Sequence, residues 1–393
     1  TYTVSAWCKL GNTNNSKTIF SSDVEDDGAN YGSLSIEADG LLKFINLTSS
    51  SLVTNYQSNR KLLDTTSWYH IVLRVDTTQS TAGDRIRMYV NGVQETSWAY
   101  STTPNQDTDT GVFKSGNATL VGARHGSSSQ NFWNGNLAHV HIVEGQSYAP
   151  TVFGETDSTT GEWKPILSPS VTYSADNSAF LKFENSGALG TDSSGQSNDF
   201  TVNGDLKQSV STTSNLFCTL DANQAHTVSN IHYAGTSFLG TSTSARGVNS
   251  TQMVKNGKWY FEVKVETDRT TTNGATLGIV KNGTYASSFF KSEGSTAVVG
   301  NSSSSNGAEG ISYQPMTATP NILDAGGGGT VNYGSQASAN DIIMCAFDLD
   351  NGKIWFGKNG TWFDAPSTSD AGDPANGNYE GLSFAKGDDF WGI

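Results

Sequence analysis

Short segments in which apolar and polar residues alternate run along most of the chain, separated by turns rich in Gly, Asn, Ser and Asp. In the segment RIRMYVNG, the side chains of Ile86, Met88 and Val90 share one face of an extended strand. Asn91-Gly92 then follows as a two-residue hairpin signal. Because no segment of the sequence shows a sustained helical period, the pattern predicts an all-β protein.

The strand signals fall into two blocks. Residues 1–150 and 224–393 each contain enough strands for one antiparallel β-sandwich of the jelly-roll kind. Residues 151–223 are richer in Pro, Ser and Thr, but they also contain Phe180 and Phe200, which require burial. We therefore predict two antiparallel β-sandwich domains joined by an ordered connecting segment.

The composition indicates a folded protein and argues against two classes of partner. The 9 Trp, 14 Tyr and 18 Phe residues supply the buried area that folding requires. A formal net charge of −14, without clusters of basic residues, argues against binding to nucleic acid. No apolar run in the sequence is long enough to span a bilayer, so we expect no membrane insertion.

The three cysteines are widely spaced and lie among apolar or aromatic neighbours: Cys8, Cys218 and Cys345. They form no CxxC motif, which argues against a metal or redox site. We expect buried free thiols, and one disulfide is the alternative. Free thiols fit a protein that is assembled in a reducing host cytoplasm and released later.

The sequence contains no recognisable catalytic motif. Asp348 and Asp350 flank a hairpin turn, so they are better explained as turn residues than as the carboxylate pair of a glycosidase. His139 and His141 lie on one face of a strand without an obvious third metal ligand. The sequence also lacks the motifs of serine hydrolases, zinc proteases and phosphate-binding loops. We therefore expect a protein that is not an enzyme.

Calcium is the one cofactor that the sequence supports. Two acidic loops offer the oxygen ligands that this hard cation prefers. The candidate ligands in the two loops are Asp23, Glu25, Asp26, Asp27, Asp107 and Asp109. The alternative is that both loops are only solvated acidic turns.

Aromatic residues beside loops are candidates for stacking on sugar rings, and neighbouring amides for bonding to sugar hydroxyls. The candidate ligand-binding residues in the two blocks are Trp98, Tyr100, Asn131, Trp133, Asn134, Tyr285, Phe289, Phe290 and Trp362. For Trp133, a position in the core is the stronger interpretation.

The first block resembles the laminin-G/concanavalin A-like jelly-roll family. The resemblance rests on motifs in a fixed order: Thr3-Val4-Ser5-Ala6-Trp7, Trp68-Tyr69-His70-Ile71-Val72, Ile86-Arg87-Met88-Tyr89-Val90-Asn91-Gly92, Leu120-Val121-Gly122 and Trp133-Asn134-Gly135-Asn136-Leu137-Ala138. It implies a domain that binds carbohydrate or protein, sometimes through calcium.

The last block resembles the SPRY (B30.2-like) family. The motifs that carry this resemblance are Gly257-Lys258-Trp259-Tyr260-Phe261-Glu262-Val263 and the hairpin from Asp341 to Phe356, where Met344 occupies a position at which glycine is common. The resemblance implies a second β-sandwich that acts as an interaction module, with loops that choose the partner.

Together, the two blocks resemble virion proteins of tailed phages. We expect a structural protein of a tail fibre or appendage that contacts a host-surface glycan or protein and other virion proteins. It would form a homo-oligomer, a trimer if it is a fibre, and would lie on the outer surface of the particle.

Three other functions are alternatives to a tail fibre. They are a capsid decoration or head fibre, a bacterial extracellular adhesin and, last, a polysaccharide-degrading enzyme. Because the chain starts within a strand pattern and ends directly after FWGI, we also expect it to be a piece of a longer polypeptide.

Overall fold

The computed structural model describes residues 1–393 except 24–28, 125–130, 175, 205, 210, 214–216, 222–230, 233–234, 239–247, 268–275, 282–309 and 325–328. The regular structure of the described residues consists of β-strands and two short 3-10 helices, η1 (Ala82–Asp84) and η2 (Pro150–Val152). The prediction of an all-β fold is confirmed. Within these same ranges, no helix has the length and apolarity of a membrane span.

The chain forms two compact units. The first unit contains Thr1–Phe217 and Ile231–Ser237, and the second contains Cys218–Asn230 and Phe238–Ile393. Most of the segment that the sequence suggested as a connection therefore belongs to the first unit. A two-stranded sheet of β15 (Ile231–His232) and β16 (Ser237–Phe238) lies where the chain passes between them.

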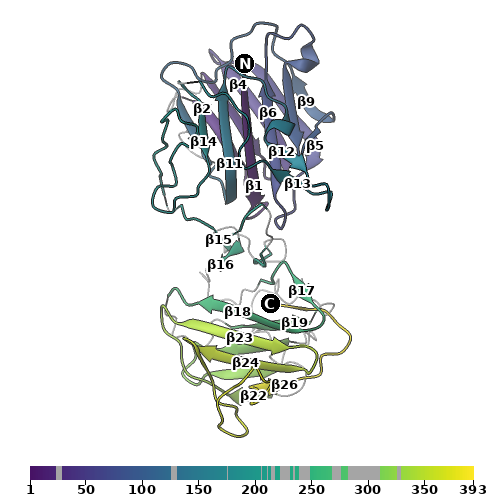
Figure 1. Cartoon of the computed structure of the whole chain (residues 1–393), viewed down its shortest axis with the longest axis vertical. Coiled ribbons are helices and arrows are strands. Elements are labelled where there is room, and N and C mark those ends of the chain that lie inside the picture. Colours follow the sequence, from purple (N-terminus) through teal and green to yellow (C-terminus); the bar gives the residue numbers. More distant parts are fainter. Residues whose placement is uncertain are drawn as a thin grey trace. The chain divides into compact units, whose positions relative to one another are not determined.

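The first unit is a sandwich of two antiparallel six-stranded sheets (Figure 1). Sheet A has the order β14-β11-β1-β6-β7-β8 and consists of β1 (Tyr2–Leu10), β6 (Tyr69–Val75), β7 (Ile86–Val90), β8 (Val93–Gln94), β11 (Gly135–Glu144) and β14 (Ala179–Leu181). Sheet B has the order β10-β2-β3-β4-β5-β9 and consists of β2 (Lys17–Asp23), β3 (Tyr31–Ile36), β4 (Leu41–Thr48), β5 (Ser51–Lys61), β9 (Trp98–Thr102) and β10 (Ala118–Val121).

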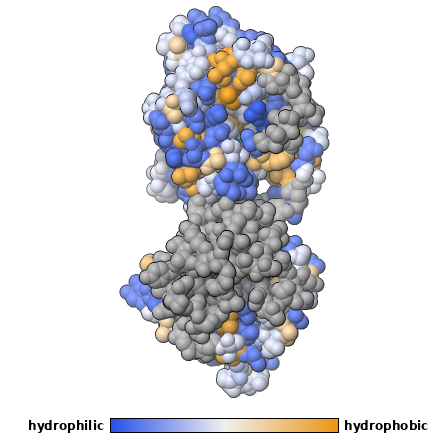
Figure 2. All heavy atoms as spheres, turned by 180° about the vertical axis from the view of Figure 1, so that it is seen from behind, coloured by the Kyte–Doolittle hydropathy of each residue, from blue (hydrophilic) through white to orange (hydrophobic). Residues whose placement is uncertain are grey.

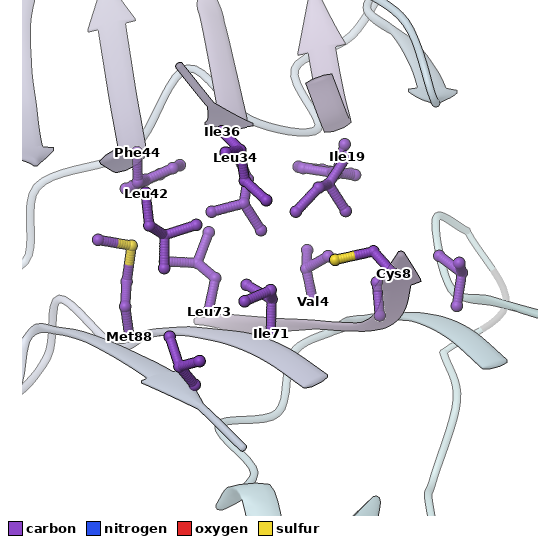
Figure 3. Packing of buried hydrophobic residues seen from close by; sticks show 14 of the residues in the cluster. Val4, Cys8, Ile19, Leu34, Ile36, Leu42, Phe44, Ile71, Leu73 and Met88 are labelled. Atoms are coloured by element: carbon purple, nitrogen blue, oxygen red, sulfur yellow. The ribbon is translucent and has the colours of Figure 1, made fainter. Parts of the chain in front are cut away.

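The core of the first unit lies between these sheets, as Figure 3 shows. Alternate residues of the strands point inward from both sides, because side chains alternate between the faces of a strand. The labelled side chains are Val4, Cys8, Ile71, Leu73 and Met88 from sheet A, and Ile19, Leu34, Ile36, Leu42 and Phe44 from sheet B. The intervening residues of sheet A, such as Ser5 and His70, therefore point to its outer face.

Residues 145–174, which we call the strap, cover this outer face. The strap contains η2, β12 (Gly154–Thr156) and β13 (Trp163–Pro165), and Figure 1 shows β12 and β13 in front of sheet A. Phe153 of the strap forms a small buried cluster with Val72, Tyr89 and Val143 of the sheet. Sheet A is therefore packed on both faces.

Buried polar contacts also hold the strap. The indole Nε1 of Trp163 donates a hydrogen bond to Nδ1 of His70 at 2.9 Å. Because an indole can only donate, the other ring nitrogen of His70 carries the proton and donates to Oγ of Ser5 at 2.8 Å. The His70 ring also stacks on Trp7, with ring centroids 4.7 Å apart. Burial lowers the pKa of His70 to about 3, with a smaller effect from His139.

The second unit is another sandwich. Sheet C has the order β17-β27-β19-β20-β21-β22, formed by β17 (Met253–Val254), β19 (Leu277–Lys281), β20 (Gly310–Gln314), β21 (Asn321–Asp324), β22 (Gly329–Asn332) and β27 (Trp391–Gly392). Sheet D has the order β18-β23-β24-β25, formed by β18 (Lys258–Lys264), β23 (Ile342–Asp348), β24 (Lys353–Lys358) and β25 (Thr361–Trp362). Strand β26 (Leu382–Ser383) also pairs with β24.

The hairpin between β23 and β24 explains the acidic pair that the sequence singled out. The carboxylate of Asp348 accepts hydrogen bonds from the backbone N–H groups of Asp350 and Asn351 and from the Asn351 side chain, at 2.8–3.1 Å. The carboxylate of Asp350 accepts the N–H of Gly257 at 3.0 Å. Asp348 therefore stabilises the turn, and Asp350 connects the turn to the residue that precedes β18.

The thiol prediction needs one correction. Cys8 and Cys345 are buried free thiols in strands β1 and β23, as expected. Cys218 is a free cysteine but is exposed. Its apolar neighbour Phe217 is itself 46% exposed, so a short apolar cluster in the sequence was not a reliable sign of burial there.

Candidate functional site

A pocket of about 300 Å³ lies on one side of the first unit, where the edge strands of the two sheets, β8 and β9, lie next to each other without pairing. We call it the side pocket. Its lining residues are Tyr56, Gly83, Ile86, Gln94, Glu95, Thr96, Trp98 and Ser101. A ligand site of this volume is at the small end of the usual range, which is roughly 300–1,000 Å³.

Trp98 provides one aromatic wall of the side pocket. It lies opposite Ser58 in the pairing of β9 with β5, and its ring meets Tyr56 edge-on with centroids 4.9 Å apart. The Tyr56 hydroxyl is hydrogen-bonded to Oγ1 of Thr103. Trp98 therefore packs against Tyr56 and the core of the first unit, while part of the indole remains exposed to solvent.

Glu95 provides a carboxylate at the same place. The residue is only 4% exposed, and its Oε1 lies 2.8 Å from Nε of Arg60. Burial raises the pKa of Glu95, and the neighbouring Arg60 charge opposes this shift. The backbone N–H of Glu95 donates to the carbonyl of Met88 at 2.8 Å, which fixes its position directly after β8.

The side pocket therefore combines two aromatic rings, a carboxylate next to a cation, the hydroxyls of Thr96 and Ser101, and the amide of Gln94. Aromatic faces pack on the apolar faces of sugar rings, and the polar groups can bond to sugar hydroxyls. Glycoside hydrolysis usually needs two carboxyl groups on either side of the bond that is cleaved. Glu95 is the one acidic residue among the described residues that line the side pocket.

The outer face of sheet B adjoins the side pocket through strand β9. Across this face, Ser35, Lys43, Gln57 and Tyr100 form one row in register. Tyr100 is 59% exposed. Figure 2 shows that hydrophilic residues dominate the visible surface of the first unit, with apolar residues in small separate patches. Ser35 is only 5% exposed, so the accessible part of this row consists of Lys43, Gln57 and Tyr100. Sequence reasoning identified only Tyr100 in it.

The candidates in residues 131–134 lie at the opposite edge of sheet B from Trp98 and Tyr100. The backbone carbonyls of Asn131 and Asn134 accept hydrogen bonds from Thr18 and Gly11. Trp133 packs against the core, in agreement with the stronger of its two interpretations. The structure therefore does not bring these three residues together with Trp98.

The acidic loops are only partly described. Asp23 ends β2 and is buried, whereas Glu25, Asp26 and Asp27 lie outside the described residues. Asp109 forms an ion pair with Lys114, and the backbone N–H of Asp107 donates to the carbonyl of Thr77. Among the residues with a described position, no group of three or more His, Cys, Asp or Glu could hold a metal. The calcium site stays a prediction.

In the second unit, Trp362 lies on β25 and meets Tyr260 edge-on, with ring centroids 6.1 Å apart. The other three candidates in this unit, Tyr285, Phe289 and Phe290, lie outside the described residues.

Residues 1–153 match the family model of the concanavalin A-like lectin/glucanases superfamily, and residues 258–371 match that of the SPRY domain. No curated protein matches the sequence. The mild departure at Met344 therefore does not prevent the match to the SPRY model.

Similar solved structures include a native heptameric SAP-like pentraxin from Limulus polyphemus, at 19% identity over 38% of this chain and 65% of that chain, with a TM-score of 0.27. Another is domain 4 of a GH43 extracellular arabinanase from Geobacillus stearothermophilus in complex with arabinotriose. The match has 20% identity, covers 38% of this chain and 63% of that chain, and has a TM-score of 0.28. The chain covers less than two thirds of each of these two structures.

A third similar structure contains domains LG4-5 of the mouse laminin alpha1 chain. The match has 9% identity, covers 100% of this chain and 75% of that chain, and has a TM-score of 0.27. These TM-scores are too low to support any functional argument. The family models and the two sandwiches lead to one conclusion. The chain carries a concanavalin A-like jelly-roll domain at residues 1–153 and a SPRY domain at residues 258–371.

Proposed function

We propose that this chain is a non-enzymatic glycan-binding protein that attaches a larger assembly to a cell surface. The observation that carries the proposal is the side pocket, where Trp98 and Tyr56 lie beside the carboxylate of Glu95 and several hydroxyls. The single acid in the described lining supports binding rather than cleavage. The match of this unit to a superfamily of lectins and glucanases agrees with a sugar ligand.

Within this proposal, the assembly is a virion and the chain is part of a tail fibre or an equivalent appendage. The buried free thiols Cys8 and Cys345 support assembly in a reducing compartment. An open pocket of this size would bind one sugar weakly, and a fibre with several copies gains avidity by repetition. Immunogold labelling of intact particles tests this assignment. Labelling of the capsid instead of the tail would contradict it.

The glycan-binding role is tested with the full chain on an array of oligosaccharides, using a Trp98→Ala variant. We expect Trp98→Ala to weaken binding to one set of the glycans recognised by the unchanged chain by at least about tenfold, which corresponds to about 1.4 kcal/mol. The reason is that the variant loses the aromatic wall on which the sugar ring packs.

Phe132→Ala is the matched control, because Phe132 is 64% exposed at the opposite edge of sheet B. It should bind glycans like the unchanged chain. Equal binding by Trp98→Ala and Phe132→Ala would rule out the side pocket as the glycan site. Release of shortened oligosaccharides during incubation would instead show that the protein is an enzyme.

A further inference from the structure

The second unit contains a pocket of its own, with a volume of about 360 Å³. It lies between β22, an edge strand of sheet C, and the segment that leads into β26 on sheet D. Its lining residues are Val331, Pro366, Ser367, Thr368, Tyr379, Glu380, Gly381, Leu382 and Ser383. We call it the SPRY pocket. None of its residues was singled out by the sequence.

Tyr379 has an unusual backbone conformation in this pocket. Its φ is +54°, and a bulky residue in this left-handed region is a genuine outlier. Its flanking residues are tied to β24, because Nε1 of Trp355 donates to the Asn378 carbonyl at 2.8 Å and the Gly381 N–H donates to the Ile354 carbonyl at 2.9 Å. The side chain is nevertheless 44% exposed. Strain that the surrounding structure maintains in this way is concentrated at functional positions.

Glu380 is fixed next to this ring. Its carboxylate accepts a hydrogen bond from Oγ of Ser383 at 2.8 Å and another from Nζ of Lys353 at 3.2 Å. Burial alone would raise the pKa of Glu380, but hydrogen bonds and the Lys353 charge lower it overall. The residue therefore remains a charged acceptor that is already oriented by its neighbours.

The SPRY pocket and the side pocket share several chemical features. Each lies where edge strands of two sheets approach, and each has a partly exposed aromatic ring and several hydroxyls. In each, a carboxylate is neutralised by one cation, Glu95 by Arg60 and Glu380 by Lys353. This combination suits a ligand with apolar ring faces and many hydroxyls.

We propose that the SPRY pocket is a second glycan site, which takes a neutral sugar ring stacked on Tyr379 with a hydroxyl directed at Glu380. The net charge of −14 disfavours acidic and sulfated glycans. Because hydrogen bonds already orient the Glu380 carboxylate, little of its side-chain freedom is lost on binding. A peptide that added a strand would find two short strands at this pocket: β26, with two residues that already pair with β24, and the four-residue edge strand β22. It would therefore gain few backbone hydrogen bonds.

The test compares full-length variants on an array of neutral, acidic and sulfated oligosaccharides and on a second array of random peptides. The informative variant is Tyr379→Gly, because glycine adopts the observed backbone conformation without strain. We expect Tyr379→Gly to lose at least tenfold in binding to a set of neutral glycans while its melting temperature does not fall. Phe390→Ala is the control, since Phe390 is 48% exposed in the same unit but does not line the pocket.

Trp98→Ala should still bind this set of neutral glycans as strongly as the unchanged chain, because the SPRY pocket does not depend on the side pocket. Glycan binding by Tyr379→Gly equal to that of the unchanged chain would overturn the second site, even if Trp98→Ala shows that the first site exists. A second result would also overturn the second glycan site. In this result the unchanged chain binds peptides but no glycan, and Tyr379→Gly abolishes the peptide binding.

Discussion

At the scale of single residues, Asp192 shows how one carboxylate organises a loop. It accepts hydrogen bonds from the backbone N–H groups of Phe180, Ser194 and Asn198 at 2.8–3.0 Å, and from Oγ of Ser194 at 2.7 Å. Burial would raise its pKa, but these hydrogen bonds lower it overall. The sequence segment DSSGQSND is therefore a structural loop that fixes β14 at the edge of sheet A.

We expect Asp192→Ala to lower the free energy of unfolding of the first unit by about 2–3 kcal/mol, because several partly buried donors lose a charged acceptor. Urea unfolding measures the change. Glu162→Ala is the control, since Glu162 is exposed and such surface changes stay within about 0.5 kcal/mol. Equal stability of the two variants would show that the loop does not depend on Asp192.

Turn residues show how much of the local structure was predictable. Asn91-Gly92 and Asn359-Gly360 both have two consecutive positive φ values, as their two-residue hairpins require. Asn351-Gly352 also lies in a hairpin, but four residues separate its strands and only Gly352 has a positive φ. The sequence therefore predicted the position of this hairpin but not its loop length, because Asp348 adds side-chain hydrogen bonds to the turn.

At the scale of elements, the strap is the feature that local patterns could not predict. Ser5 and His70 occupy alternate positions in their strands, so the local pattern by itself only places polar residues on one face of sheet A. Its cover comes from Trp163, which lies 93 residues after His70 in the chain. Nothing in the spacing of either segment indicates that they meet.

The strap gives the first unit a stability that depends on pH. The unfolded chain protonates His70 near pH 6.5, whereas the folded chain does so only near pH 3. Between these values the unfolded state binds more protons. The free energy of unfolding should therefore fall as the pH falls below 6.5, and should change little from this group at higher pH. Burial also lowers the pKa of His141, which adds to the effect.

Urea unfolding of the full chain from about pH 7.5 to 5 measures this dependence, in a range where histidine is the main titrating side chain. His70→Asn should reduce the slope, because its amide does not titrate. An unchanged slope in this variant would mean that another group causes the loss of stability.

At the scale of the whole molecule, the chain places its two candidate pockets at the lateral edges of two sandwiches. The sequence identified Trp98 because an aromatic residue beside a loop is a visible signal. It could not identify Glu95 or Tyr379. The Glu95 carboxylate pairs with Arg60 on another strand, and hydrogen bonds to β24 hold the backbone on both sides of Tyr379. Both depend on tertiary structure.

One contact of the strap also determines where the protein can be engineered. A Cβ atom on Gly92 would lie 2.8 Å from the Trp163 ring, whereas a Cβ atom on Gly360 would have nothing within 4 Å. The two Asn-Gly turns look the same in the sequence, yet only the turn at Gly360 has free space around it for added atoms. An epitope tag inserted after Gly360 should leave expression and folding intact, and the same tag after Gly92 should cause aggregation. Size-exclusion chromatography measures whether each of the two fusions is aggregated. It therefore shows which turn tolerates an insertion and which does not.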